Sequence, residues 1–172
     1  MNSKLDFIFN RRSVRKFTAE AVSEENITEL LESAMAAPSA CAKDPWRFIV
    51  IKNRENLRQI AELLPNGKFL AQAPAGIVVC GDINAAHAES ESYMLQDCSA
   101  AIENILLASV ALGLGTCWLG VHPRPERIAG IAKFFELPAN IVPVSVIAIG
   151  HPEKMPDKHT RFMANNIHWE KW

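Results

Sequence analysis

Residues 91–120 read ESYMLQDCSAAIENILLASVALGLGTCWLG, and they hold the longest periodic segment of the chain. Apolar residues recur on one broad face of a helix that we predict from Glu91 to Leu112. Gly113 and Gly115 follow, and glycines in this position typically end a helix. The next residues, Thr116 to Leu119, form a short apolar run that predicts a strand. A long helix that leads straight into a strand indicates a domain built from layers of helix and sheet.

The sequence on both sides of this stretch repeats the alternation of strand and helix. The patterns predict further helices at 24–37, 54–64 and 126–135, and strands at 46–51, 76–80 and 142–149. Such alternation by itself favours an α/β fold with a parallel sheet. However, the chain has neither GxGxxG nor GxxxxGK[ST], the glycine-rich motifs that commonly accompany that fold. The pattern alone therefore leaves the direction of the strands open.

Composition limits the classes of protein that this chain can belong to. It has 172 residues, of which 49% are hydrophobic and 22% charged, with a formal net charge of -1. These values predict one globular domain and exclude a disordered or fibrous protein. Near-neutral charge argues against nucleic acid as a partner. The N-terminus has no signal-peptide core, and the apolar run from Ala100 to Leu114 is too short and too polar to span a bilayer, so we expect a cytoplasmic protein that does not bind membranes.

The sequence contains no pattern of metal-binding or nucleophilic catalytic residues. The four cysteines form no CxxC pair, and neither HExxH nor GxSxG occurs. We therefore expect no metal site. Cys80 and Cys117 lie inside apolar runs, which predicts buried thiols and suits a reducing compartment.

A cluster of cations near the N-terminus is the clearest chemical signal. Residues 11–16 read RRSVRK, which places four cations and a hydroxyl within six residues, after a short predicted helix. Such a cluster can be a solvated basic turn. It can also be a phosphate site, because planar guanidinium groups bind phosphate oxygens bidentately. A second cationic set, Lys158, His159 and Arg161, lies near the other end of the chain. Two basic sets in a neutral protein favour a small phosphorylated ligand.

The C-terminal segment, residues 151–172, differs from the rest of the chain. It has little helical periodicity, yet it contains Phe162, Ile167, Trp169 and Trp172. Burying each aromatic side chain is worth about 1.5–3 kcal/mol, so this segment should not remain in water. It either wraps its own domain or reaches a partner subunit, and periodicity does not distinguish the two.

Short motifs, each weak by itself, follow one another in a fixed order along nearly the whole chain. They are RRSVRKF (11–17), APS (37–39), PWRF (45–48), DCSAAIEN (97–104), GLGTCWLG (113–120), IGHP (149–152), RF (161–162) and HWEKW (168–172). In this order they resemble the FMN-dependent nitroreductase family.

The resemblance implies an α+β fold in which a mainly antiparallel central sheet is enclosed by helices. It implies a single FMN-binding domain over residues 1–172 and a homodimer with two FMN molecules between the subunits. The long helix from Glu91 to Leu112 would lie in the dimer interface. Residues 151–172 would be exchanged between subunits, embracing the partner.

The resemblance also implies roles for twelve residues. Those at the phosphate and ribityl end of FMN would be Arg11, Arg12, Ser13, Lys158 and Arg161. Arg15 would reach the pyrimidine edge of the flavin, and a strand would pass along the ring through Trp118, Leu119 and Gly120, with a backbone N–H near N5. The residues that approach from the other subunit would be Pro38, Ser39 and Ala40.

The implied activity is transfer of a hydride from NADH or NADPH to flavin N5, followed by electron transfer to a nitroaromatic, a quinone or a similar small acceptor. No side-chain acid or base is required, because the cofactor supplies the reactive atom. Arg15 would stabilise negative charge on the reduced flavin. Two alternatives stay open: a flavin-binding protein that stores FMN, senses redox state or fragments flavin, and a binder of another phosphorylated small molecule.

The chain departs from the family pattern at two places. Many relatives carry Asn where this chain has Ala42, and Gln where it has Asp44. The chain is also short for the family, without room for an extra helical excursion over the active site. We expect these differences to alter the substrate face, and an acidic Asp44 would have to point away from reduced flavin.

Overall fold

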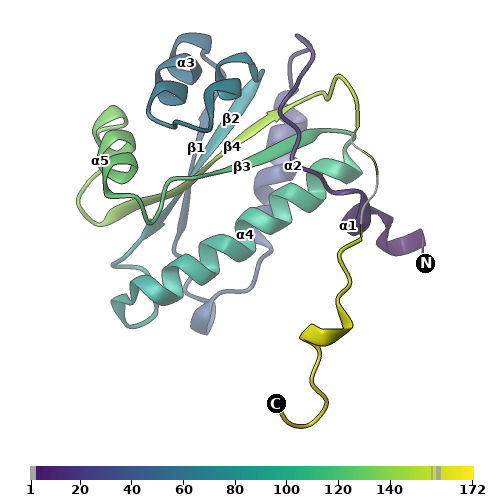
Figure 1. Cartoon of the computed structure of the whole chain (residues 1–172). Coiled ribbons are helices and arrows are strands. Elements are labelled where there is room, and N and C mark those ends of the chain that lie inside the picture. Colours follow the sequence, from purple (N-terminus) through teal and green to yellow (C-terminus); the bar gives the residue numbers. More distant parts are fainter. Residues whose placement is uncertain (1–2, 156, 158–159) are drawn as a thin grey trace.

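The computed structural model of the chain describes residues 3–155, 157 and 160–172. Within these residues, four strands form one antiparallel sheet in the order β1-β2-β4-β3 (Figure 1). The strands are β1 (Trp46–Ile51), β2 (Ala75–Asp82), β3 (Gly115–Gly120) and β4 (Ile141–Gly150). The parallel sheet that the alternation favours is therefore wrong, and the antiparallel sheet that the resemblance implied is confirmed.

The misleading signal comes from strands that are buried on both faces. In β2, Ile77 and Val79 contribute to one apolar core, whereas Val78 and Cys80 contribute to a second core on the opposite face. Successive side chains of a strand point to opposite faces, so both faces of this sheet are covered. Such strands are near-continuous apolar runs, a pattern that is typical of parallel sheets.

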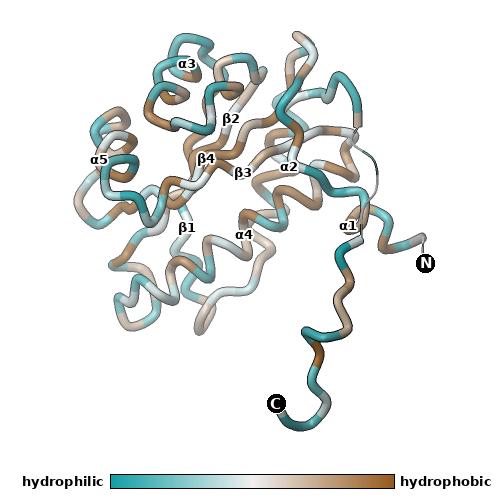
Figure 2. Tube along the Cα trace, in the orientation of Figure 1, coloured by the Kyte–Doolittle hydropathy of each residue, from teal (hydrophilic) through white to brown (hydrophobic). Residues whose placement is uncertain are grey.

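Helices cover the two faces in separate layers, giving an α+β arrangement of three layers. The helices are α1 (Asp6–Asn10), α2 (Glu24–Met35), α3 (Arg54–Glu62), α4 (Glu91–Ala111) and α5 (Pro125–Phe134). Buried residues of α2 and α4 join the first core, and buried residues of α3 and α5 join the second. Figure 2 shows apolar residues concentrated on the sheet and on the helix faces turned toward it.

The predicted helices occur where expected, with ends shifted by one or two residues. Ser23 is the N-cap of α2, and its hydroxyl accepts a hydrogen bond from the backbone N–H of Asn26 at 3.0 Å. The helix ends at Met35 rather than Ala37, because Pro38 disfavours helical backbone in the residue before it. Gly113 follows α4 with a φ of 70°, a conformation that glycine adopts without strain.

The two edges of the sheet differ. Among the described residues, β1 pairs with β2 alone. The outer edge of β3 instead carries the N-terminal cationic segment: Ser13 forms a parallel bridge with Thr116, and the backbone N–H of Val14 donates to the Thr116 carbonyl at 2.9 Å. The cations of residues 11–16 are thereby fixed against the sheet.

The expected burial of Cys80 and Cys117 is confirmed, and Cys98 is buried as well. Burial raises the pKa of the Cys80 and Cys98 thiols to about 12, and raises the pKa of Cys117. Because the thiolate is the reactive form, a thiol reagent at about pH 8 should modify the exposed Cys41 alone in the native protein. Mass spectrometry should find one label per native chain and four after unfolding; rapid native labelling of Cys80 would contradict this assignment.

After β4 the chain leaves the body of the domain and runs past α1 (Figure 1). Its aromatic side chains lie in solvent on this chain: Phe162 is 78% exposed, Trp169 84% and Trp172 101%. The first residues of the segment, 151–153, pair with residues 16–18 of the same chain, whereas these aromatic side chains are not covered by their own domain. Among the described residues, no helix combines the length and the apolar character needed to cross a membrane.

Candidate functional site

Arginines from the two cationic sets, distant in sequence, line one cavity of about 500 Å³. Arg11 and Arg12 follow α1, and Arg161 reaches the same cavity from the C-terminal segment. The other lining residues are Ile8, Phe9, Thr160 and Phe162. Lys158 lies outside the described residues. The arrangement puts three guanidinium groups around one space, which fits a phosphate group.

The contacts of these arginines leave their charges available. The Nε of Arg11 lies 3.9 Å from Oε1 of Glu103 on α4, a long and partly solvated ion pair. The Nε of Arg12 donates to the carbonyl of Asp157 at 2.9 Å, which neutralises no charge. Exposed pairs of this kind contribute about 0–1 kcal/mol. A bound anion can therefore replace the present contacts of Arg11 and Arg12 with little loss of stabilising free energy.

Arg15 lines two further cavities. One, of about 340 Å³, is lined by Ser13, Arg15, Lys16 and Lys154 among others. The other, of about 180 Å³, is lined by Arg15 together with the β3 residues Trp118, Leu119 and Gly120. The guanidinium carbon of Arg15 lies 5.9 Å from the Phe69 ring centroid, a cation–π contact that restrains it.

Three residues that the sequence did not single out as site residues line the same smaller cavity. Asn66 and Phe69 follow α3, and Arg127 lies in α5 and donates from Nη1 to the Gly120 carbonyl at 2.8 Å. The Asn66-Gly67 pair reads only as a turn in the sequence. Nothing in the sequence pattern marks Phe69 or Arg127, because the fold alone brings them to β3.

Pro38, Ser39 and Ala40 do not join the other predicted residues within one chain. They line a separate cavity of about 320 Å³ with Tyr93, Gln96, Asp97 and Ala100 of α4. That these three residues act on the other subunit's cofactor stays a prediction.

Asp44 is held by its neighbours. Its carboxylate accepts a hydrogen bond from the Ser39 hydroxyl, and its backbone N–H donates to the same hydroxyl at 3.0 Å. The Arg47 guanidinium donates to the Asp44 carbonyl at 3.3 Å. The charge of Asp44 is therefore turned toward Ser39 within its own turn.

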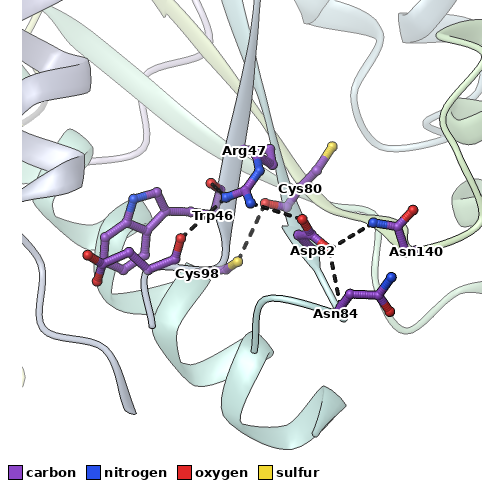
Figure 3. A network of polar contacts seen from close by, with 8 residues as sticks. Trp46, Arg47, Cys80, Asp82, Asn84, Cys98 and Asn140 are labelled. Carbon is purple, nitrogen blue, oxygen red and sulfur yellow. Dashed lines mark hydrogen bonds and ion pairs between the residues drawn. The ribbon is translucent and has the colours of Figure 1, made fainter. Parts of the chain in front are cut away.

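Arg47 belongs to a polar network that joins the ends of β1 and β2 (Figure 3). Its Nη2 donates to Oδ2 of Asp82 at 2.9 Å, and Asn140 donates to the other carboxylate oxygen at 2.8 Å. The Asn140 hydrogen bond, followed by the charge of Arg47, lowers the pKa of Asp82 below its ordinary 3.8. The resulting stabilisation is present above that ordinary pKa and is lost as the pH falls through the lower value.

Taken in chain order, the residues that line these cavities run from the arginines at 11–12, through Ser13, to Arg15 beside β3. Arg11, Arg12 and Arg161 suit a phosphate, and Ser13 lies next to them. Arg15 and the exposed Trp118 lie farther along β3, beside a space that a flat ring system can enter. These residues fit FMN in charge and in order.

The model of the Nitroreductase family matches residues 8–67 and 62–151 of the chain. The chain belongs to the nitroreductase family. This assignment agrees with the antiparallel sheet and with the motifs that carry the resemblance.

Relatives of this chain match it over nearly its whole length. A Methanothermobacter thermautotrophicus protein, provisionally named NADH dehydrogenase/NAD(P)H nitroreductase, is 43% identical over 98% of this chain and 87% of its own. A solved Parabacteroides distasonis protein with the same provisional name has a TM-score of 0.93 and 38% identity, covering 100% of both chains. A provisionally named nitroreductase of Desulfovibrio desulfuricans, solved in complex with FMN, has a TM-score of 0.84 and 32% identity over 100% of this chain and 99% of its own.

The Val14 side chain of the cationic segment packs closely against Gly115 at the start of β3. A Cβ on Gly115 would lie 2.8 Å from the side-chain carbons of Val14. Gly115→Ala should therefore push Val14 away and lower the free energy of unfolding by about 1–3 kcal/mol, the usual cost of overpacking. Urea denaturation measures this. Gly120→Ala is the control, because its Cβ would meet nothing closer than 3.9 Å; equal stability of the two variants would contradict the contact.

Proposed function

We propose that this protein is an FMN-dependent oxidoreductase. It takes a hydride from NADH or NADPH and passes electrons to a nitroaromatic, a quinone or a similar small acceptor, in alternating half-reactions. The observation that carries this proposal is the order of the site: Arg11, Arg12 and Arg161 line one cavity, and Arg15, a few residues farther along the chain, lines another with β3. The FMN complex of the Desulfovibrio desulfuricans relative and the NAD(P)H in the names of other relatives support it.

FMN, when bound, supplies a ring nitrogen that accepts a hydride. The residues of this chain bind and polarise it. Arg11, Arg12 and Arg161, with Lys158, bind the phosphate. Ser13 binds the ribityl end, and Trp118, Leu119 and Gly120 of β3 lie along the ring. Arg15 places a positive charge at the pyrimidine edge, which stabilises the negative charge that develops there during reduction.

The working unit in this proposal is a cytoplasmic homodimer. Residues 1–172 form one domain, and residues 151–172 embrace the partner subunit. Pro38, Ser39 and Ala40 reach the partner's FMN, and α4 packs in the interface. The exposed Phe162, Trp169 and Trp172 support the exchange, since each offers a large apolar surface that the chain itself does not cover.

A visible spectrum of the purified protein tests the function. We expect the absorbance of bound FMN, its bleaching under anaerobic conditions on addition of NADH or NADPH, and its return when a quinone or nitroaromatic is added. Bound flavin that neither nucleotide bleaches would overturn the reductase and favour a flavin store or sensor. Failure of the apoprotein to bind FMN would point to another phosphorylated ligand.

Arg15→Gln tests the role of the charge at the pyrimidine edge. The variant keeps hydrogen-bond donors but removes the charge, so it should destabilise the reduced flavin by about 1.5–3 kcal/mol. For a two-electron couple this lowers the midpoint potential by about 30–60 mV. A dye-coupled redox titration measures the shift, and stopped-flow reduction by NAD(P)H should slow in parallel.

Arg15→Lys is the matched control. It retains a positive charge, so the midpoint potential of its flavin should stay close to that of the wild type. FMN affinity should survive in both variants, since the phosphate contacts are intact. An unchanged potential together with strongly weakened FMN binding would place Arg15 at the phosphate end instead.

A further inference from the structure

Asp97 of α4 is a buried acidic residue with no role in the site described above. It is 6% exposed, and its Oδ1 accepts a hydrogen bond from the backbone N–H of Ala40 at 2.9 Å. Its Oδ2 is also buried and accepts no hydrogen bond from any residue that the structure describes. Burying a carboxyl group with so few partners is unfavourable, so its presence needs a reason.

The turn that Asp97 contacts has an unfavourable backbone. Cys41, Ala42 and Asp44 have φ values of 53°, 51° and 47°. Residues with a Cβ rarely adopt this left-handed conformation, and they keep it only where surrounding contacts impose it. Residues 39–44 therefore depend on external anchors for their shape.

Hydrogen bonds hold the turn at residues 39–44 internally and at both of its ends. Within it, Asp44 and Ser39 bind each other through side chain and backbone. At its C-terminal end, Arg47 holds the Asp44 carbonyl and is itself held by Asp82 (Figure 3). At its N-terminal end, the hydrogen bond from the Ala40 N–H to Asp97 ties it to the N-terminal third of α4.

We infer that Asp97 is a positioning residue that holds the turn at 39–44 against α4, so that Ser39 and Ala40 are presented to the flavin of the partner subunit. This inference rests on the proposed function. A further observation supports it beyond the hydrogen bond. Asp97 lines the same cavity as Pro38, Ser39 and Ala40.

Proteolysis of flavin-free protein tests the anchor without the cofactor. Lys43 is exposed within the turn, so trypsin can report its opening by cleaving the Lys43–Asp44 bond. In Asp97→Ala this cleavage should accelerate by about tenfold, as expected for loss of one hydrogen bond to a charged group. Asp97→Asn keeps an acceptor at the same place and should restore most of the protection, and it serves as the second variant if Asp97→Ala folds poorly.

Asn104→Ala is the matched control. Asn104 lies on the same helix and donates from its side chain to the Ser33 carbonyl of α2 at 2.9 Å, outside the turn. The Asn104→Ala substitution should leave the rate of tryptic cleavage at Lys43 unchanged. Equal acceleration in Asn104→Ala and Asp97→Ala would overturn the inference, because the effect would then be general loosening of α4.

FMN binding tests the link between the anchor and the cofactor. FMN affinity should fall by about tenfold in Asp97→Ala, through displacement of the turn, and the visible circular dichroism of the saturated flavin should change. Both should stay near wild type in Asp97→Asn and Asn104→Ala. Faster proteolysis with unaltered affinity and dichroism would overturn the positioning role. Wild-type protein that binds no FMN would instead overturn the proposed function, while the proteolysis result would still stand for the anchor.

Discussion

Deletion of residues 161–172 is expected to give insoluble or flavin-free protein. The deleted segment carries Phe162, Trp169 and Trp172, which are exposed on the single chain. If they are buried on a partner, each contributes about 1.5–3 kcal/mol, and the interface exceeds about 2,000 Å² as in permanent complexes. Sedimentation analysis and the flavin absorbance of the purified variant measure the outcome.

The deletion also removes Arg161. The effect of losing the aromatic side chains must therefore be separated from the effect of losing one phosphate contact. Arg161→Ala in the full-length chain is the control: it should remain a folded dimer with weakened FMN binding. A folded, flavin-loaded monomer after the deletion would contradict the exchange of this segment between subunits.

Arg11→Ala is expected to weaken FMN binding by about tenfold to a hundredfold, the effect of losing one charge-assisted contact with a phosphate. Riboflavin, which lacks the phosphate, should bind poorly to the wild type and equally poorly to the variant. Isothermal titration of the apoprotein with both ligands measures this difference.

Lys133→Ala is a suitable control, because it removes the same charge from the far end of α5. Its FMN affinity should match that of the wild type. Equal affinities of the wild type for FMN and riboflavin would show that the arginines of residues 11–16 are a solvated basic turn and not a phosphate site.

Local patterns were sufficient to predict the helices and strands but not the direction of the strands. Helical periodicity and Ser23 predicted α2, and the long periodic run predicted α4. The apolar run at 76–80 was compatible with a strand of either direction, because burial on both faces removes the alternation that marks a half-exposed antiparallel strand. The antiparallel sheet was reached only through the family resemblance.

The site was predictable where several residues lie together in sequence. Arg11, Arg12 and Arg15 form a dense cluster whose composition suits an anion site, although a solvated basic turn has the same composition. Phe69, Arg127 and Asp97 are single residues of common types, and they reach the site or its neighbouring turn only through the packing of α3, α5 and α4. No short-range pattern marks such residues, so they were missed as site residues.

The unequal edges of the sheet limit how copies of this chain can associate. Among the described residues, the backbone of β1 pairs with β2 alone, whereas residues 13–14 pair with β3 at Thr116. Continuous edge-to-edge stacking of sheets into a filament requires an accessible strand at both edges of every molecule. The N-terminal segment therefore removes part of one edge from such stacking.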